Sequence, residues 1–127
     1  MKILFIHQNF PGQFKFLGPA LVKEGHKVFA LAIRDKTVKW KGIDVISYQP
    51  ARATSKEIHP WISDFETKVI RAEAVYRKLL ELKEKGLNPD LIVAHPGWGE
   101  SLLVKNIWPS VKLGISCEFH YAASVLD

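Results

Sequence analysis

The chain has 127 residues, of which 47% are hydrophobic and 24% are charged, a balance typical of one globular domain with its own core. No apolar run approaches the length of a membrane-spanning helix, and no nucleic-acid-binding module can be recognised. The formal net charge of +5 favours anionic partners, such as nucleotide phosphates or an acidic membrane surface. The single cysteine excludes an internal disulfide and fits a reducing compartment.

The N-terminal half of the chain alternates between strand and helix patterns. Short apolar runs rich in branched residues predict buried strands at residues 2–6, 27–32 and 43–49. Apolar residues at helical spacing predict a helix over residues 14–24, which Gly25 ends. Pro19 either kinks this helix or lies in its first turn. The basic stretch 34–41 is interpreted as a solvated edge or loop.

The C-terminal half continues the alternation. A long helix is predicted over residues 61–85, with Gly86 after its end. His59 is interpreted as a helix-start or loop residue. Its expected core stripe consists of Ile62, Phe65, Val69, Ala72, Tyr76, Leu79 and Leu80. A strand, a short helix and a fifth strand are then predicted at residues 91–95, 100–108 and 112–119. Cys117 lies within the last of these strands and is expected in the core.

This order of elements predicts an α/β fold, with a Rossmann-like parallel sheet and helices on both faces. The expected strand order is 3-2-1-4-5, in which the first and fourth strands are neighbours. The loops that follow these two strands read HQNFPGQF and HPGWGES. Ligands of open parallel sheets bind in the crevice where two such loops diverge. The sequence therefore predicts a ligand site at the carboxyl edge of the sheet.

The loop after the first strand contains Gly12, which lets the backbone approach a ligand just ahead of a predicted helix N-terminus. Such a helix end suits phosphate, although PGQF matches neither of the usual nucleotide-binding glycine patterns. A simple tight turn is an equally open interpretation. His7 ends the strand before this loop and can bind a hydroxyl or phosphate, act as a base, or serve only the structure.

The loop after the fourth strand begins with His95, for which the same alternatives are open. Gly97 and Gly99 permit unusual backbone angles, and Glu100 is expected in the first turn of a helix. Trp98 either stacks on a sugar or base, or packs onto the domain surface. Glu118 and His120 follow at the same predicted edge. The spacing of these residues predicts no metal site.

Two stretches carry a family resemblance: MKILFIHQNFPGQFKFLGPAL with the later GHKV, and NPDLIVAHPGWGESLLVKNIWP. They resemble the N-terminal region of bacterial family-four glycosyltransferases, which are retaining enzymes of the GT-B fold. The resemblance covers residues 1–121. It implies an N-terminal domain that binds the acceptor, and a C-terminal domain that grips a nucleotide-sugar donor. No metal ion or other cofactor is implied.

The resemblance also implies roles for individual residues. Pro11, Gly12 and Gln13 would approach the donor diphosphate. The acceptor and sugar site would contain His7, His95, Gly97, Trp98, Gly99 and Glu100. The catalytic position at the end of the fifth strand falls on either Glu118 or His120, because the register is open there.

The chain is shorter than such a two-domain enzyme, so residues 1–127 are expected to be an isolated N-terminal domain, inactive without its C-terminal donor domain. The expected location is cytoplasmic, with peripheral contact at the inner face of the membrane. The alternative hypothesis is a non-catalytic Rossmann-like module that binds a nucleotide or a protein. A flavodoxin-like or receiver domain is a weaker alternative, because the acidic pair of a receiver and a flavin phosphate loop are missing from the sequence.

Overall fold

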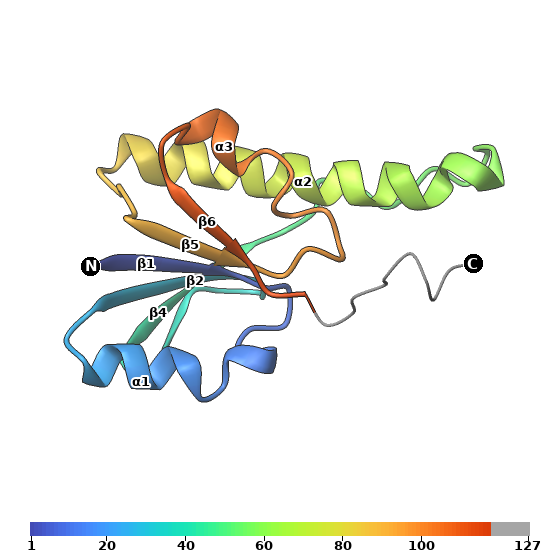
Figure 1. Ribbon diagram of the computed structural model, residues 1–127. Helices are drawn as coiled ribbons and strands as arrows, with labels where there is room; N and C mark the ends of the chain where they lie inside the picture. Colours follow the sequence, from blue (N-terminus) through green and yellow to red (C-terminus); the bar gives the residue numbers. More distant parts are fainter. Residues whose placement is uncertain (118–127) are drawn as a thin grey trace, which may run out of the picture.

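The computed structural model describes residues 1–117, in which a six-stranded sheet lies between helices on both of its faces (Figure 1). The strands are β1 (Lys2–Ile6), β2 (Lys27–Ile33), β3 (Val38–Trp40), β4 (Ile43–Tyr48), β5 (Leu91–Ala94) and β6 (Lys112–Ile115). The helices are the 3-10 turn η1 (Gly12–Phe14), α1 (Leu17–Lys23), α2 (Pro60–Glu84) and α3 (Val104–Ile107). The predicted α/β, Rossmann-like class is confirmed.

The strand order is β3-β4-β2-β1-β5-β6. The five strands expected from the sequence are parallel and follow the predicted order 3-2-1-4-5. The additional strand, β3, pairs antiparallel with β4 at the edge of the sheet. It comes from the basic stretch, which is therefore an edge strand. Lys41 and Gly42 adopt left-handed backbone angles (φ 48° and 82°), which reverse the chain between the two strands.

The alternation of side chains along β1 divides the core into two layers. Ile3 and Phe5 pack into the layer that contains Phe10 and Phe14 from the loop after β1. Leu4 and Ile6 point the other way, into the layer formed with α2 and α3. Because both faces of β1 are covered, all four of its apolar residues are fully buried. β1 is thus a rigid centre from which the loop carrying His7 and Gly12 departs.

The helix after β1 begins later than predicted. Gly12 opens only the short turn η1, and α1 starts at Leu17. The delay has a packing cause: Phe14 is buried, and its ring lies 4.8 Å from that of Phe5, so the chain descends to the core before it turns into the helix. The expectation of a helix N-terminus directly after Gly12 is therefore wrong. Pro19 lies in the first turn of α1, one of the two predicted alternatives.

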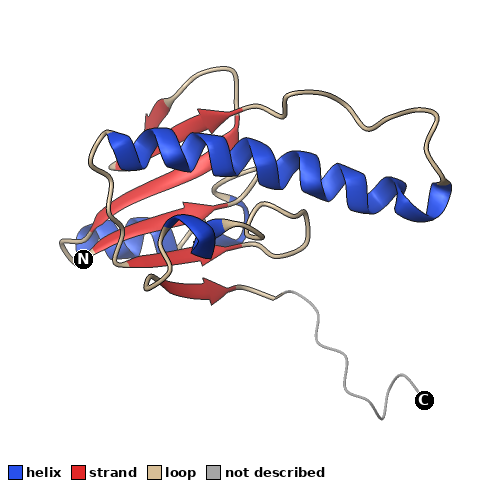
Figure 2. Ribbon diagram, turned by 90° about the horizontal axis from the view of Figure 1, so that it is seen from above, coloured by secondary structure: helices blue, strands red, loops and turns tan. Residues whose placement is uncertain are grey.

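Helix α2 starts at Pro60, and the His59 ring caps it by accepting a hydrogen bond from the Trp61 N–H at 3.1 Å. Seen from above, the N-terminal half of α2 extends past the ends of the strands (Figure 2). The predicted core stripe is therefore wrong in this half, and it is also wrong at Leu80, which is 38% exposed. Phe65 in the N-terminal half is 65% exposed, whereas Ala72 and Leu79 over the sheet are buried.

The C-terminal elements are shorter than predicted. The helix expected over residues 100–108 is only α3, so Glu100 precedes it rather than lying in its first turn. Strand β6 ends at Ile115, and Cys117 is exposed, which corrects its assignment to the core. Glu118 and His120 lie outside the described residues. Within residues 1–117, no helix is both long enough and apolar enough to cross a membrane.

Candidate functional site

The register of the sheet places two histidines side by side at its carboxyl edge. Ile6 and Ala94 are paired across β1 and β5, so His7 and His95 leave neighbouring strand ends. The His95 N–H donates to the Ile6 carbonyl at 3.0 Å, which fixes this register through the first loop residue. The two ring centroids are 5.3 Å apart, and the side chains are 5% and 7% exposed. The two loops predicted to flank a crevice thus bring together a close, mostly buried histidine pair at this edge of the sheet.

Trp98 completes an aromatic cluster with these histidines. Its ring is stacked on His95, with centroids 4.0 Å apart and an interplanar angle of 22°. It meets His7 edge-on at 5.1 Å and 90°. The indole is only partly buried. Trp98 therefore braces both imidazoles, while part of its ring stays at the surface of the loop.

The hydrogen bonds of the two histidines define their protonation pattern. Nδ1 of His7 accepts from the Asn9 N–H at 3.0 Å, and Nδ1 of His95 accepts from the Gly97 N–H at 3.2 Å. A backbone N–H can only donate, so each Nδ1 carries a lone pair and the proton of the neutral ring is on Nε2. In this tautomer Nε2 is a donor and has no lone pair with which to act as a base. The arrangement suits binding of an oxygen better than removal of a proton.

Glycines allow both loops to close over these rings. A Cβ at Gly12, whose φ is 46°, would lie 2.5 Å from Cε1 of His7. A Cβ at Gly97 would lie 2.9 Å from Cε1 of His95. At Gly99, whose φ is 97°, a Cβ would come within 2.8 Å of Cα of Lys68 in α2. Real Cβ atoms do not approach other atoms so closely. Gly12, Gly97 and Gly99 are therefore required because a side chain at any of them would overlap its neighbour.

Glu100 is a buried anchor beneath the second loop. It is 2% exposed, and its Oε2 accepts a hydrogen bond from the Tyr48 hydroxyl at 2.9 Å. Burial raises the pKa of the Glu100 carboxyl, and the Tyr48 hydroxyl, the nearby Gln8 amide and the Arg71 charge partly offset this rise. The same burial, with the carboxyl beside it, raises the pKa of Tyr48. Glu100 thus ties the loop to the end of β4.

Side-chain hydrogen bonds also hold the first loop. The Gln13 amide donates to Ser116 at the end of β6, at 2.8 Å to Oγ and 3.3 Å to the carbonyl oxygen. Arg34, just after β2, donates to the Phe10 carbonyl. Pro11 accepts a 2.7 Å bond from the Phe14 N–H, which forms the turn η1. The loop that begins at β1 is therefore pinned on both sides, toward β2 and toward β6.

Several residues around the site were missed by the sequence analysis. They share a position at the carboxyl edge of the sheet or on the helix beside it: Gln8, Arg34, Tyr48, Arg71 and Ser116. Tyr48 had a usable signal, because it is a polar-tipped aromatic at the end of a predicted buried strand. The others had none, since their roles depend on which loop lies above each strand end.

Among residues 1–117, no three histidine, cysteine, aspartate or glutamate side chains lie close enough together to hold a metal ion. The absence of a metal from the activity stays a prediction. The catalytic roles of Glu118 and His120 also stay predictions, because both residues lie outside the described part of the chain.

The sequence matches a model of the glycosyl transferase family 4 group over residues 24–127. The match includes β5 and the loop from His95 to Glu100, but begins after the Gly12 loop. A comparison with curated proteins gave no match. The family match covers most of the chain and fits the α/β fold with its site at the carboxyl edge. The chain therefore belongs to the glycosyl transferase family 4 group, and its role lies in glycosyl transfer.

Proposed function

We propose that residues 1–127 form the acceptor-side domain of a retaining glycosyltransferase. In this proposal, a second, C-terminal domain holds a nucleotide-sugar, and the sugar passes to a hydroxyl of a glycan or a lipid-linked acceptor. The observation that carries the proposal is the cluster of His7, His95 and Trp98 between two glycine loops at the carboxyl ends of β1 and β5. Such a site lies where the donor domain of a two-domain enzyme would face it.

The chemistry of the cluster suits a sugar. An indole presents an apolar surface to the carbon-bound face of a sugar ring, and the imidazoles place polar ring nitrogens beside it. Gly12 is exposed and left-handed, so its backbone can approach a diphosphate more closely than any other residue type would allow. In this scheme Pro11, Gly12 and Gln13 form the donor side of the crevice, and residues 95–99 form the acceptor side.

Glu100 has a different role in the proposal from the one expected of it. Because its carboxyl is buried against Tyr48, it positions the loop and does not itself contact the acceptor. Glu118 and His120 remain the candidates for the group nearest the transferred sugar. A cytoplasmic location, and activity without a metal ion, complete the proposal.

The test is the substitution Gly12→Ala in the protein that carries this domain together with its donor domain. The added methyl group would displace the His7 ring, so we expect kcat/KM for sugar transfer to fall by about a hundredfold, the usual result of misplacing a binding group by about 1 Å. Gly25→Ala is the matched control, since Gly25 is also left-handed (φ 91°) but has no described atom within 4 Å of the added Cβ.

Unchanged transfer by a folded Gly12→Ala protein would remove the role assigned to this loop. If the parent protein binds nucleotide but transfers no sugar to any acceptor, the non-catalytic binding module becomes the better description.

A further inference from the structure

One face of α2 changes from buried to exposed where the helix leaves the sheet. Positions 61, 65, 68, 72 and 79 are separated by three, four or seven residues, so they share one side of the helix. Over the sheet, Ala72 and Leu79 are 1% and 0% exposed. Further toward the N-terminus, Phe65 and Trp61 on the same side are 65% and 90% exposed. The side of α2 that packs on the sheet therefore continues beyond it as an aromatic overhang, defined here as Trp61 and Phe65.

The overhang begins at the candidate site. Lys68, between its buried and exposed parts, lies directly against Gly99 of the loop that carries His95 and Trp98. The exposed half of α2 projects beyond the carboxyl ends of the strands, where this loop also lies (Figure 2). A ligand bound at the loop of His95 and Trp98 would thus have an apolar ridge close by, which begins one helical turn past Lys68.

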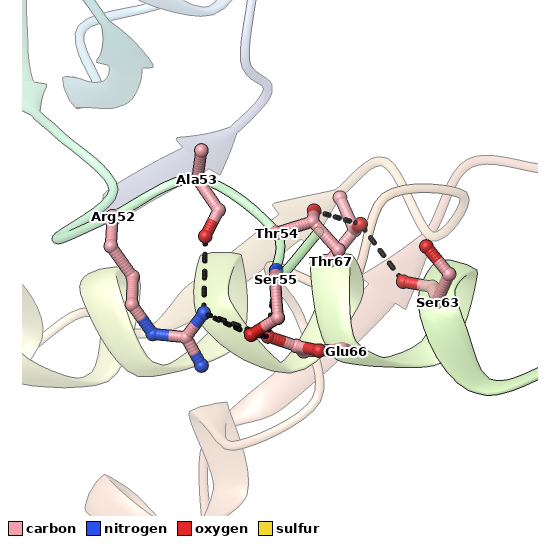
Figure 3. A network of polar contacts seen from close by, with 7 residues as sticks. All are labelled: Arg52, Ala53, Thr54, Ser55, Ser63, Glu66 and Thr67. Atoms are coloured by element: carbon pink, nitrogen blue, oxygen red, sulfur yellow. Dashed lines mark hydrogen bonds and ion pairs between the residues drawn. The ribbon is translucent and has the colours of Figure 1, made fainter. Parts of the chain in front are cut away.

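Another face of the same helix half is already occupied. The segment 52–55 packs there through Arg52, whose guanidinium lies 2.7 Å from Glu66, and through Ser55, which donates to the same carboxylate at 2.7 Å (Figure 3). Thr54 and Thr67 are hydrogen-bonded beside them. The His59 ring meets Trp61 edge-on at 5.4 Å. These contacts hold the projecting helix in place while the Trp61 and Phe65 side remains open.

We infer that Trp61 and Phe65 bind the apolar chain of an amphiphilic acceptor whose hydroxyl-bearing head occupies the cluster of His7, His95 and Trp98. This inference rests on the proposed function and narrows its acceptor class from a glycan or a lipid-linked hydroxyl to the second. Aromatic side chains with a low entropic cost of ordering are well suited to a flexible alkyl chain, since burial of each methylene removes apolar surface from water.

The aromatic overhang is too small to be the interface with a second copy of the chain. An aromatic side chain can bury about 150–250 Å² of surface, so the two residues of the overhang can bury about 400 Å² in total. The flanking Ile62 and Val69 are only 51% and 38% exposed and extend it modestly. A stable interface needs about 800 Å² from each partner.

The charge around the overhang does not favour binding to an anionic membrane. Residues 52–71 contain four basic and three acidic side chains, and two of the basic ones are paired within the segment: Lys68 with Asp64 at 2.8 Å and Arg52 with Glu66 at 2.7 Å. Attraction to anionic lipid needs a cluster of unpaired lysines and arginines. The excess positive charge of the chain therefore lies elsewhere.

The test is calorimetric titration of the chain with alkyl maltosides of increasing chain length, each below the concentration at which it forms micelles. For the unsubstituted chain, we expect about tenfold tighter binding from octyl to dodecyl maltoside, less than full burial of four methylenes would give. The Trp61→Ser/Phe65→Ser variant should lose this dependence on chain length. Phe16→Ser is the matched control, because Phe16 is 79% exposed beside α1 on the opposite face of the sheet.

A dependence on chain length that persists in the double variant would overturn the inference. So would equal loss in Phe16→Ser, a dimer in sedimentation that dissociates only in the double variant, or binding of the unsubstituted chain to anionic vesicles that contain no sugar. The proposed function has its own readout in the same titrations. Dodecyl maltoside and dodecyl phosphocholine have the same alkyl chain, so tighter binding of the maltoside reports recognition of the sugar head. Trp98→Ala should abolish that preference, whatever happens to the dependence on chain length.

Discussion

The loops after β1 and β5 reach the same local geometry by different means. Each begins with a histidine whose Nδ1 accepts from the backbone N–H two residues later, and each has a glycine packed against that imidazole. The first loop is held by apolar burial, with Phe10 and Phe14 1% and 3% exposed. The second is held by one buried polar pair, Glu100 with Tyr48, and by its close contact with α2.

This difference predicts how each loop responds to change. A loop anchored by two buried apolar rings has no titratable group in its anchor and tolerates the loss of a surface hydrogen bond. A loop anchored by a buried carboxyl depends on one hydroxyl and on protonation. The second loop should therefore be the more fragile half of the site.

The largest effect should come from Gly99→Ala. The new Cβ would collide with the backbone of Lys68, which cannot rotate away, and φ of 97° is already unfavourable for alanine. We expect a loss of about 2–4 kcal/mol in the free energy of unfolding, measured in urea. Gly25→Ala separates the two causes, since it carries only the backbone strain and should cost about 1 kcal/mol. Equal losses in both variants would show that the loop does not depend on its contact with α2.

The next largest effect on the free energy of unfolding should come from Tyr48→Phe. It removes the donor at 2.9 Å from Glu100 and leaves a buried carboxyl with less compensation, so the free energy of unfolding should fall by about 2 kcal/mol. In the Glu100→Gln background the same substitution should cost about 1 kcal/mol, because a hydrogen bond to a neutral amide contributes less stability than one to a carboxyl group. A double-mutant cycle measures this coupling. A coupling of zero would mean that the pair does not anchor the loop.

A third effect is a dependence on pH. Burial raises the pKa of Glu100 above its ordinary value of 4.5, so above that value the folded chain keeps a proton that the unfolded chain releases. The unfolded state then binds fewer protons, and the contribution of Glu100 to stability falls as pH rises through this window. Glu100→Gln should therefore gain stability relative to the unsubstituted chain as the pH rises above about 4.5.

The quantity to compare is the difference in free energy of unfolding between Glu100→Gln and the unsubstituted chain at each pH. Glu66 and Glu81 have lowered pKa values and change stability with pH in the opposite direction, but they do so equally in both proteins. A difference that is constant with pH would contradict the buried position of the carboxyl.

The smallest effect should come from Gln13→Ala in the first loop. Its bonds to Ser116 are exposed, and the buried rings of Phe10 and Phe14 hold the loop without them. We expect less than about 0.5 kcal/mol in unfolding experiments. A loss comparable to that of Tyr48→Phe would remove the distinction between an apolar and a polar loop anchor.

The sequence alone determined the five parallel strands and their order, although it did not reveal the edge strand β3. Apolar runs such as 2–6 and 91–94 are long and uninterrupted enough to be buried whatever surrounds them, and right-handed crossovers leave few ways to connect them. That order was sufficient to bring the loops of His7 and His95 together. The glycines at 12, 97 and 99 were recognisable in the sequence as turn residues, whereas the atoms that each of them leaves room for were set by packing.

Tertiary structure alone decided which faces were covered. The helical pattern of α2 is equally apolar at Phe65 and Leu79, but only Leu79 has a sheet beneath it. Glu100 was expected in the first turn of a helix, yet Tyr48, which is 52 positions away in sequence, makes it a buried anchor. Periodicity specifies the side of an element on which a residue lies, whereas burial depends on where the neighbouring elements end, and that is set by packing across the whole domain.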